Sequence, residues 1–172
     1  GASGGIGEAF ARRLASDGHD LVLVARSAEK LEALCSELQS SYSIDARYIE
    51  LDLSRPDADK ELFEKTKQLD LNISFLINNA GFGSQGDFAV LPIEKELEMI
   101  RLNILALVGL SHLYLEKMRE RRSGTIVNIS SAAGFQPVPF MATYAATKAF
   151  VTSFTEAISE ENRPFGIRIL AV

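Results

Sequence analysis

This sequence is poor in cysteine and histidine and has no excess of basic residues. The single cysteine, Cys35, cannot form an intramolecular disulfide, which favours a reducing, cytoplasmic setting. His19 and His112 stand outside any cluster of cysteine, histidine and carboxylate residues with metal-ligand spacing, so we expect no metal site. The net charge of −5 provides no basic field to attract nucleic acid or an anionic membrane.

Long apolar runs are also missing. The longest, Ile104–Leu110, falls far short of the roughly 18 residues that a membrane-spanning helix needs. The first residues contain neither an initiator methionine nor the basic and apolar stretches of a targeting signal. We therefore expect a soluble protein without a membrane span.

The composition is that of a globular domain. Of the 172 residues, 47% are hydrophobic and 24% are charged, and a chain of this length normally forms one domain with a sizeable core. Short apolar runs alternate with helical patterns, which is typical of strand–helix units in a parallel sheet. The pattern therefore predicts a three-layer α/β/α, doubly wound parallel sheet.

The individual elements follow from the same periodicity. Strands are predicted over Leu21–Ala25, Arg47–Leu53, Ile73–Ile77, Thr125–Ser130 and Ile167–Val172. Helices are predicted over Gly5–Gly18, from Ser54 and Pro56 to Leu69, over Ile93–Arg119 and over Thr143–Glu161. A further helix is predicted to begin after Ser27 as its N-cap, with a buried face formed by Leu31, Leu34, Cys35 and Leu38.

A phosphate-binding turn normally follows a central strand, and no strand precedes Gly1. Without that strand, its two neighbours in the sheet would face unpaired backbone groups. We therefore expect residues 1–172 to form a single dinucleotide-binding and catalytic domain within a chain that extends beyond both ends.

The glycine-rich start of the chain is a candidate phosphate site. Gly1, Gly5 and Gly7 have the spacing GxxxGxG and open a predicted helix. Glycines let backbone N–H groups approach a pyrophosphate, and the positive end of the helix favours its charge. Taken alone, the motif is equally compatible with a glycine-rich turn that binds nothing.

The end of the first predicted strand bears on the choice of nucleotide. An NAD site normally has Asp or Glu there to hold the ribose 2′-hydroxyl, whereas this chain has Ala25 followed by Arg26. A guanidinium can grip a 2′-phosphate, so NADP(H) is favoured over NAD(H). Without the preceding glycines, Arg26 would be read as a solvated surface charge.

The segment SSAAGFQPVPFMATYAATK contains candidate acid–base residues. Tyr144 and Lys148 are at positions i and i+4 of a predicted helix and share one face. A neighbouring ammonium favours a phenolate, which makes proton exchange with an alcohol efficient near neutral pH. Ser130 and Ser131 end a predicted strand, where a hydroxyl can orient the same substrate oxygen. An exposed Tyr–Lys pair on an amphipathic helix is the alternative.

Together, GASGGIG, NNAG at Asn78–Gly81, LNILA around Asn103, NISS ending at Ser131 and YAATK resemble the short-chain dehydrogenase/reductase family over essentially the whole chain. The resemblance implies a Rossmann fold and hydride transfer between NADP(H) and a carbonyl or secondary alcohol. Family members commonly form homodimers or homotetramers through the two long helices.

The resemblance also assigns site residues. Tyr144 would be the general acid or base, and Lys148 would favour the ionised form of Tyr144 and bind the nicotinamide ribose. Ser131 would bind the reacting oxygen, and Asn103 would hold a water in a proton relay. A buried Asn103 within a long helix also predicts a local helix irregularity. The implied cofactor contacts are Gly1, Ser3, Gly5, Ile6 and Gly7 at the pyrophosphate, Asp52 and Leu53 at the adenine, and Asn79 and Ala80 at the adenine ribose.

The substrate stays open, because the family's variable substrate loop and its Pro-Gly turn after the last strand are absent. Phe135, Val138, Pro139, Phe140 and Met141 would line an apolar pocket, unless they simply pack their own loop. Two other functions also remain: an NADP(H)-binding redox sensor without turnover, and an epimerase or dehydratase of the longer relatives, although those usually carry GxxGxxG.

Overall fold

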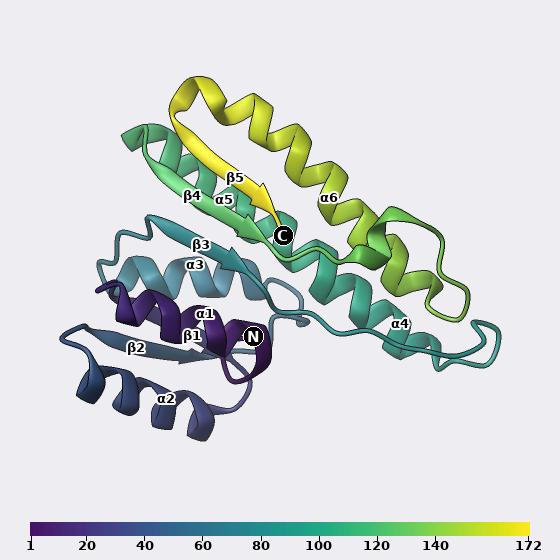
Figure 1. The fold of residues 1–172 in the computed structure, drawn as a ribbon, viewed down its shortest axis with the longest axis horizontal. Coiled ribbons are helices and arrows are strands. Elements are labelled where there is room, and N and C mark those ends of the chain that lie inside the picture. The colour runs from purple at the N-terminus through teal and green to yellow at the C-terminus, as the bar shows by residue number, and fades with distance from the viewer. The chain divides into compact units, whose positions relative to one another are not determined.

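The computed structural model describes residues 1–172, which fall into two compact units, Gly1–Leu53 and Ser54–Val172 (Figure 1). Each unit contains its own parallel sheet.

The first unit consists of α1 (Gly5–Ser16), β1 (Leu21–Ala25), α2 (Ala28–Ser41) and β2 (Ala46–Glu50). The two strands are parallel, with Leu21 opposite Ala46. The predicted Ser27 cap is confirmed, because Ser27 accepts a hydrogen bond from the Lys30 N–H. Gly18 follows α1 with a left-handed φ of 83°, which is typical of a glycine after a helix. The predicted buried face of α2 packs in the core, which is formed by Ala11, Ala15, Leu23, Ala25, Leu31, Leu34, Cys35, Leu38 and Ala46.

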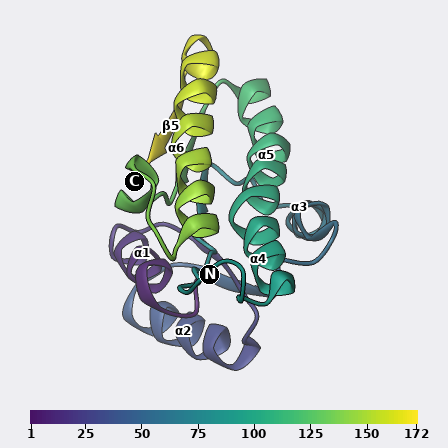
Figure 2. The ribbon, with the colours of Figure 1, turned by 90° about the vertical axis from the view of Figure 1, so that its right-hand side faces the viewer.

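The second unit contains a three-stranded parallel sheet in the order β3-β4-β5. Its elements are α3 (Ala58–Gln68), β3 (Phe75–Asn78), α4 (Ile93–Ile100), the π-helix η1 (Arg101–Ala106), α5 (Leu107–Arg121), β4 (Gly124–Asn128), the 3₁₀-helices η2 (Ala132–Phe135) and η3 (Arg163–Phe165), α6 (Ala142–Asn162) and β5 (Ile167–Ala171). Helix α5 packs against β3 and β4, and α6 packs against β5. Figure 2 shows α6 running beside α4 and α5.

Four of the five predicted strands have different bounds, because a ladder ends where its partner strand ends. β5 ends at Ala171 rather than Val172, opposite Asn128 at the end of β4. β2 ends at Glu50 rather than Leu53, opposite Ala25 at the end of β1. β4 ends at Asn128 rather than Ser130, opposite Ala171. β3 is displaced toward the C-terminus and spans Phe75–Asn78.

The predicted start of α3 at Ser54 and Pro56 is wrong. The helix begins at Ala58, after Asp57, whose backbone is left-handed with φ 58° and whose side chain does not cap the helix. The Asp57 carboxylate instead accepts a hydrogen bond from the Lys60 ammonium at 2.6 Å.

The long helix after Pro92 is continuous over Ile93–Arg121, and η1 is the irregularity predicted around Asn103. By length and composition alone, this helix is long and apolar enough to cross a membrane. A search for uninterrupted apolar runs does not detect it, because polar residues interrupt its apolar ones. The core helix of a soluble protein passes the same test, and one side of α5 is buried here, at Leu107, Leu110, Ser111, Tyr114 and Met118.

Candidate active site

The four expected catalytic residues all lie in the second unit. Asn103 is in η1, Ser131 lies between β4 and η2 as the N-cap of η2, and Tyr144 and Lys148 are on α6. The loop after β3 contributes a further segment, residues 79–92. These elements meet at the carboxyl ends of parallel strands, where α/β proteins usually place their ligand sites.

Asn103 is 2% exposed, and its amide is held by protein atoms on both sides. Its Oδ1 accepts from the Phe82 N–H at 3.2 Å, and its Nδ2 donates to the Phe82 carbonyl at 3.0 Å and to Thr147 Oγ1 at 3.1 Å. Thr147 in turn donates to the Tyr144 carbonyl at 2.7 Å. Asn103 therefore joins the π-helix to the loop after β3 and to the turn of α6 that carries Tyr144.

The ammonium of Lys148 is buried next to the same loop. The residue is 6% exposed, and its Nζ donates to the Ile129 carbonyl at 2.7 Å. Nζ is 5.8 Å from the centre of the Tyr144 ring, within the range of a cation–π contact. Burial lowers the pKa of Lys148, because an apolar environment disfavours the charged form.

Gly81 is the point at which these side chains converge. A Cβ at this position would be 2.9 Å from Asn103 Oδ1 and 3.8 Å from Lys148 Nζ. The first distance is shorter than real Cβ atoms show, and the Asn103 amide is fixed by its hydrogen bonds. Only glycine therefore lets the loop pass between the π-helix and Lys148.

The two serines after β4 have different surroundings. The Ser130 hydroxyl donates to the Lys148 carbonyl at 3.1 Å and lies 2.6 Å from Thr152 Oγ1. The Ser131 hydroxyl oxygen caps η2 by accepting from the Ala133 N–H at 3.2 Å, and its proton is left to donate to another group. Ser131 is thus the better placed of the two to bind a substrate oxygen.

The glycine turn lies in the first unit, at the N-terminus of α1. No side chain caps this helix, and Gly5 has a left-handed φ of 57°. A Cβ at Gly4 or Gly5 would meet no atom within 4 Å, so the backbone there borders open space. Uncapped N–H groups at a helix N-terminus fit a phosphate.

The other expected cofactor contacts follow the ends of strands. Arg26 is exposed directly after β1. The glycine turn lies beside the end of this strand, because the Ala2 N–H donates to the Val24 carbonyl at 3.1 Å. In the glycine turn Ser3 is half-buried, Ile6 is exposed and Gly7 is buried. The remaining residues are half-buried: Asp52 and Leu53 after β2, and Asn79 and Ala80 after β3.

The apolar segment between η2 and α6 exposes two large side chains. Phe135 is 79% exposed and Phe140 is 62% exposed, so neither is used to pack its own loop. Phe140 has a φ of 64°, a left-handed conformation that is strained for a bulky residue. Its carbonyl accepts from the Gly86 N–H at 2.8 Å, which ties this segment to the loop after β3.

Sequence reasoning missed Thr147, Thr152 and the backbone groups of Phe82 and Ile129. The two threonines carried a weak signal, since they lie three and eight residues after Tyr144 and so fall on neighbouring strips of the same helix. The backbone groups carried none, because any residue supplies them.

Comparison with known proteins gives consistent matches along the whole chain. The model of the family described as short chain dehydrogenase matches residues 1–172. The human very-long-chain 3-oxoacyl-CoA reductase is 35% identical over 177 residues, covering 100% of this chain and 56% of the human protein. The chain thus spans little more than half the length of that curated relative.

Solved structures agree with this similarity. A short-chain dehydrogenase from Sphingobium yanoikuyae in complex with NADPH has a TM-score of 0.94 and 38% identity, covering 99% of this chain and 67% of that one. The bulky-bulky ketone specific alcohol dehydrogenase from Comamonas testosteroni has a TM-score of 0.94 and 36% identity, covering 100% and 68%. The predicted Rossmann-type α/β fold is therefore confirmed.

Proposed function

The chain belongs to the short-chain dehydrogenase/reductase family, and from that premise we propose that the protein transfers a hydride between NADP(H) and a carbonyl or secondary alcohol. The observation that carries the proposal is the convergence of Asn103 and Lys148 at Gly81 and of Tyr144 at Gly83 on the loop after β3. The Ser131 hydroxyl is on the segment whose Ile129 carbonyl binds Lys148 Nζ. A protein that only binds a nucleotide has no need of this acid–base set.

NADP(H) is the cofactor that these residues fit. The uncapped N-terminus of α1 would hold the pyrophosphate, and Arg26 would bind the 2′-phosphate. The adenosine end would contact Asp52, Leu53, Asn79 and Ala80, and the nicotinamide ribose would contact Tyr144 and Lys148. The relative from Sphingobium was solved with NADPH, which supports this choice.

The bound cofactor supplies or accepts the hydride, and the protein handles the proton. In reduction, the Tyr144 phenol gives its proton to the carbonyl oxygen as that oxygen gains charge. Ser131 donates a hydrogen bond to the same oxygen, and the Lys148 ammonium stabilises the phenolate that remains. Oxidation of the alcohol uses the same groups in reverse.

Water bound near Asn103 would return the proton to Tyr144 through Lys148. We place that water on a backbone carbonyl of η1, because the amide nitrogen of Asn103 already donates to Phe82 and Thr147. A π-helix is frequent at functional sites, where its wider turn disturbs the regular backbone hydrogen bonds.

The substrate is proposed to be a large apolar ketone or the matching alcohol. Phe135 and Phe140 expose their rings on the segment that leads into α6. The names of the relatives agree, since one reduces very-long-chain 3-oxoacyl-CoA and the other is specific for bulky ketones.

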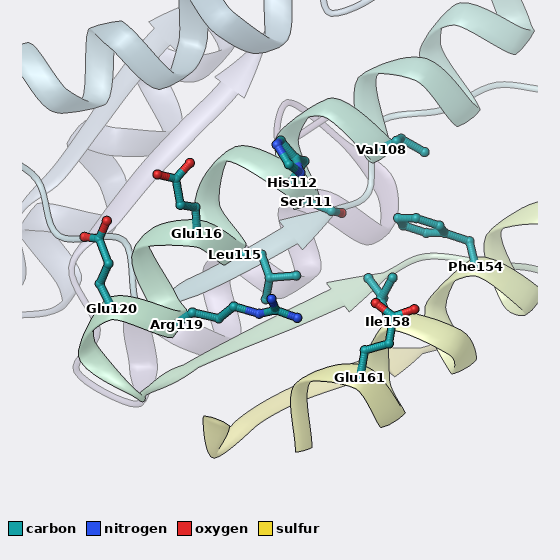
Figure 3. Close-up of a pocket in the computed structure, with 10 residues that line it drawn as sticks. All are labelled: Val108, Ser111, His112, Leu115, Glu116, Arg119, Glu120, Phe154, Ile158 and Glu161. Carbon is teal, nitrogen blue, oxygen red and sulfur yellow. The ribbon is translucent and has the colours of Figure 1, made fainter. Parts of the chain in front are cut away.

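A second copy of the chain is the proposed partner, in the cytoplasm. Helices α5 and α6 form an open groove of about 650 Å³ with an apolar floor and charged groups of both signs around it (Figure 3). The floor is formed by Val108, Leu115, Phe154 and Ile158, and the polar lining by Ser111, His112, Glu116, Arg119, Glu120 and Glu161. Charges of both signs allow such a surface to complement itself across a two-fold axis.

The decisive experiment combines cofactor binding with the loss of the acid. Calorimetric titration should show tighter binding of NADPH than of NADH. Tyr144→Phe should then lower ketone reduction by 100-fold or more, in line with the roughly 10²–10⁴-fold typical of general acids, while NADPH affinity stays unchanged. A Tyr144→Phe protein with full activity would refute the mechanism, and a wild-type protein that binds NADPH without turnover would be a redox sensor. Failure of the folded protein to bind either nucleotide would refute both functions.

A further inference from the structure

The backbone carbonyl of Lys148 has more hydrogen-bond partners than the single backbone N–H that a helical carbonyl normally binds. Besides its place in α6, it has two hydroxyls within hydrogen-bond distance, Thr152 Oγ1 at 3.2 Å and Ser130 Oγ at 3.1 Å. A threonine that bonds the carbonyl four residues earlier is common in helices. Ser130 is different, because it reaches this carbonyl from the segment after β4.

The two hydroxyls also bond each other, with 2.6 Å between Ser130 Oγ and Thr152 Oγ1. Each hydroxyl has one proton, so two protons serve the three contacts among the two hydroxyls and the carbonyl. One hydroxyl therefore donates to the other, and the second donates to the Lys148 carbonyl. Both side chains are part-buried, so the pair acts as a single hydrogen-bonded link between two segments.

A close backbone contact lies at the same peptide. A Cβ on Gly134 would be 2.7 Å from the Lys148 carbonyl carbon and 2.8 Å from the Ala149 nitrogen. Backbone atoms of a helix cannot move aside as a flexible side chain can. Gly134 thus lets η2 rest directly on α6 at the peptide that the Ser130–Thr152 pair binds.

The other end of Lys148 is bound by the same segment, because its Nζ donates to the Ile129 carbonyl. Residues 129–134 therefore hold Lys148 at its ammonium, through Ile129, and at its backbone, through Ser130 and Gly134. Ser131 belongs to this segment, and its hydroxyl lies between two of these attachment points in sequence.

We propose that Ser130 and Thr152 are a positioning pair that sets the Ser131 hydroxyl relative to Tyr144 and Lys148. Neither hydroxyl is a catalytic residue, since both are used within the protein. The inference rests on the proposed reductase function and extends it to two residues with no role of their own in the chemistry. Shifts of about 1 Å in a catalytic group can cost on the order of 100-fold in rate, so a small displacement of this segment should be measurable.

The test compares Ser130→Ala and Thr152→Val, which remove one hydroxyl each, with Thr152→Ser, which keeps it. For NADPH-dependent reduction of an apolar ketone, the first two variants should lose about tenfold or more in kcat, with KM and NADPH affinity within about twofold of wild type. Thr152→Ser should recover most of the rate. Ser153→Ala, at an exposed neighbouring position on α6, is the matched control and should equal wild type.

The double variant should be hardly slower than the worse single variant, because the two hydroxyls form one unit. Wild-type kcat in both single variants, or a Thr152→Ser protein as slow as Thr152→Val, would overturn the proposal. If Thr152→Val does not fold, Ser130→Ala is judged by the same criteria. The wild-type protein is assayed before any variant. Absence of NADPH-dependent reduction in that assay would refute the proposed function instead.

Discussion

At the scale of single residues, Lys148 carries a charge where water hardly reaches. Burial lowers its pKa below the usual 10.5, so the unfolded chain holds this proton more tightly than the folded protein does. Between the lowered pKa and 10.5 the unfolded state therefore binds more protons, and stability rises with pH. Below that interval the buried charge is a full cost to the folded state.

This cost predicts that Lys148→Met is more stable than wild type and inactive. At pH 7 its free energy of unfolding should be higher by about 0.5–2 kcal/mol, as is common when a functional residue gives way to one that suits its environment. The gain should shrink as the pH rises toward 10.5, where wild type also loses the charge. Urea unfolding at neutral and at alkaline pH measures this, and a variant less stable than wild type at pH 7 would contradict it.

Arg26 makes a second prediction at this scale. Arg26→Asp should change the cofactor preference from NADPH toward NADH, because the carboxylate repels a 2′-phosphate and accepts from a ribose hydroxyl. The loss in NADPH affinity should be tenfold or more, comparable to roughly 1.5–3 kcal/mol for a hydrogen bond to a charged group. Titration of both nucleotides tests it, with Arg13→Asp on the exposed side of α1 as control. An unchanged ratio of affinities would remove the assignment.

The residue scale also shows where sequence reasoning stops. Residue types and spacing predict the Tyr144–Lys148 pair, and the family resemblance adds Ser131 and Asn103. Thr147 was not predicted, because its role depends on contact with a helix that lies 44 residues earlier in the chain. The difference between the two adjacent serines was likewise visible only once Thr152 was seen to bind one of them.

At the scale of elements, a buried polar chain joins two strands to two helices. Asn78 Nδ2 on β3 donates to Asn128 Oδ1 on β4 at 2.8 Å and to Ser111 on α5 at 3.0 Å. Asn128 Nδ2 donates to Thr155 on α6 at 2.9 Å. The side chain of Asn128 is fully buried, so each of its bonds replaces one that water would otherwise make.

Asn128→Ala should therefore lower the free energy of unfolding by about 2–4 kcal/mol, since it removes two buried hydrogen bonds, one from Asn78 and one to Thr155. Chemical unfolding measures the loss, and Gln68→Ala at an exposed position on α3 serves as the control. Adding Thr155→Val to Asn128→Ala should lower the free energy of unfolding by less than Thr155→Val does in the wild-type protein, because the Asn128 partner of Thr155 is already missing. Full additivity of the two changes would show that the chain of bonds is not a unit.

Element types and order were predictable, whereas element ends were not. β1 has the bounds that its apolar run predicts, and α1, α2, α6 and the long helix differ by few residues. β2, β3, β4 and β5 differ because a strand exists only as far as its neighbour pairs with it. The start of α3 differs because Asp57 adopts a left-handed conformation and its carboxylate accepts a hydrogen bond from the Lys60 ammonium. No capping pattern in the sequence predicts this arrangement.

At the scale of the whole molecule, the groove between α5 and α6 predicts self-association. Phe154→Glu places a carboxylate on its apolar floor, beside existing glutamates of the lining, and should convert the oligomer to monomers. Size-exclusion chromatography with light scattering measures the mass. Gln68→Glu on α3 adds the same charge outside the groove and should leave the mass unchanged. A monomeric wild type would refute the predicted self-association, and an oligomer that survives Phe154→Glu would place the contact elsewhere.

The sequence by itself determined the parallel α/β fold, the order of its elements and the family. It could do so because periodicity, glycine spacing and the Tyr–Lys interval are local properties, each readable within a few turns of chain. Only the tertiary structure decided which hydroxyl of Ser130 and Ser131 is occupied, how Asn103 is held, and that one short segment binds Lys148 at both ends. Those facts depend on contacts between residues far apart in sequence, whose distances no local pattern contains.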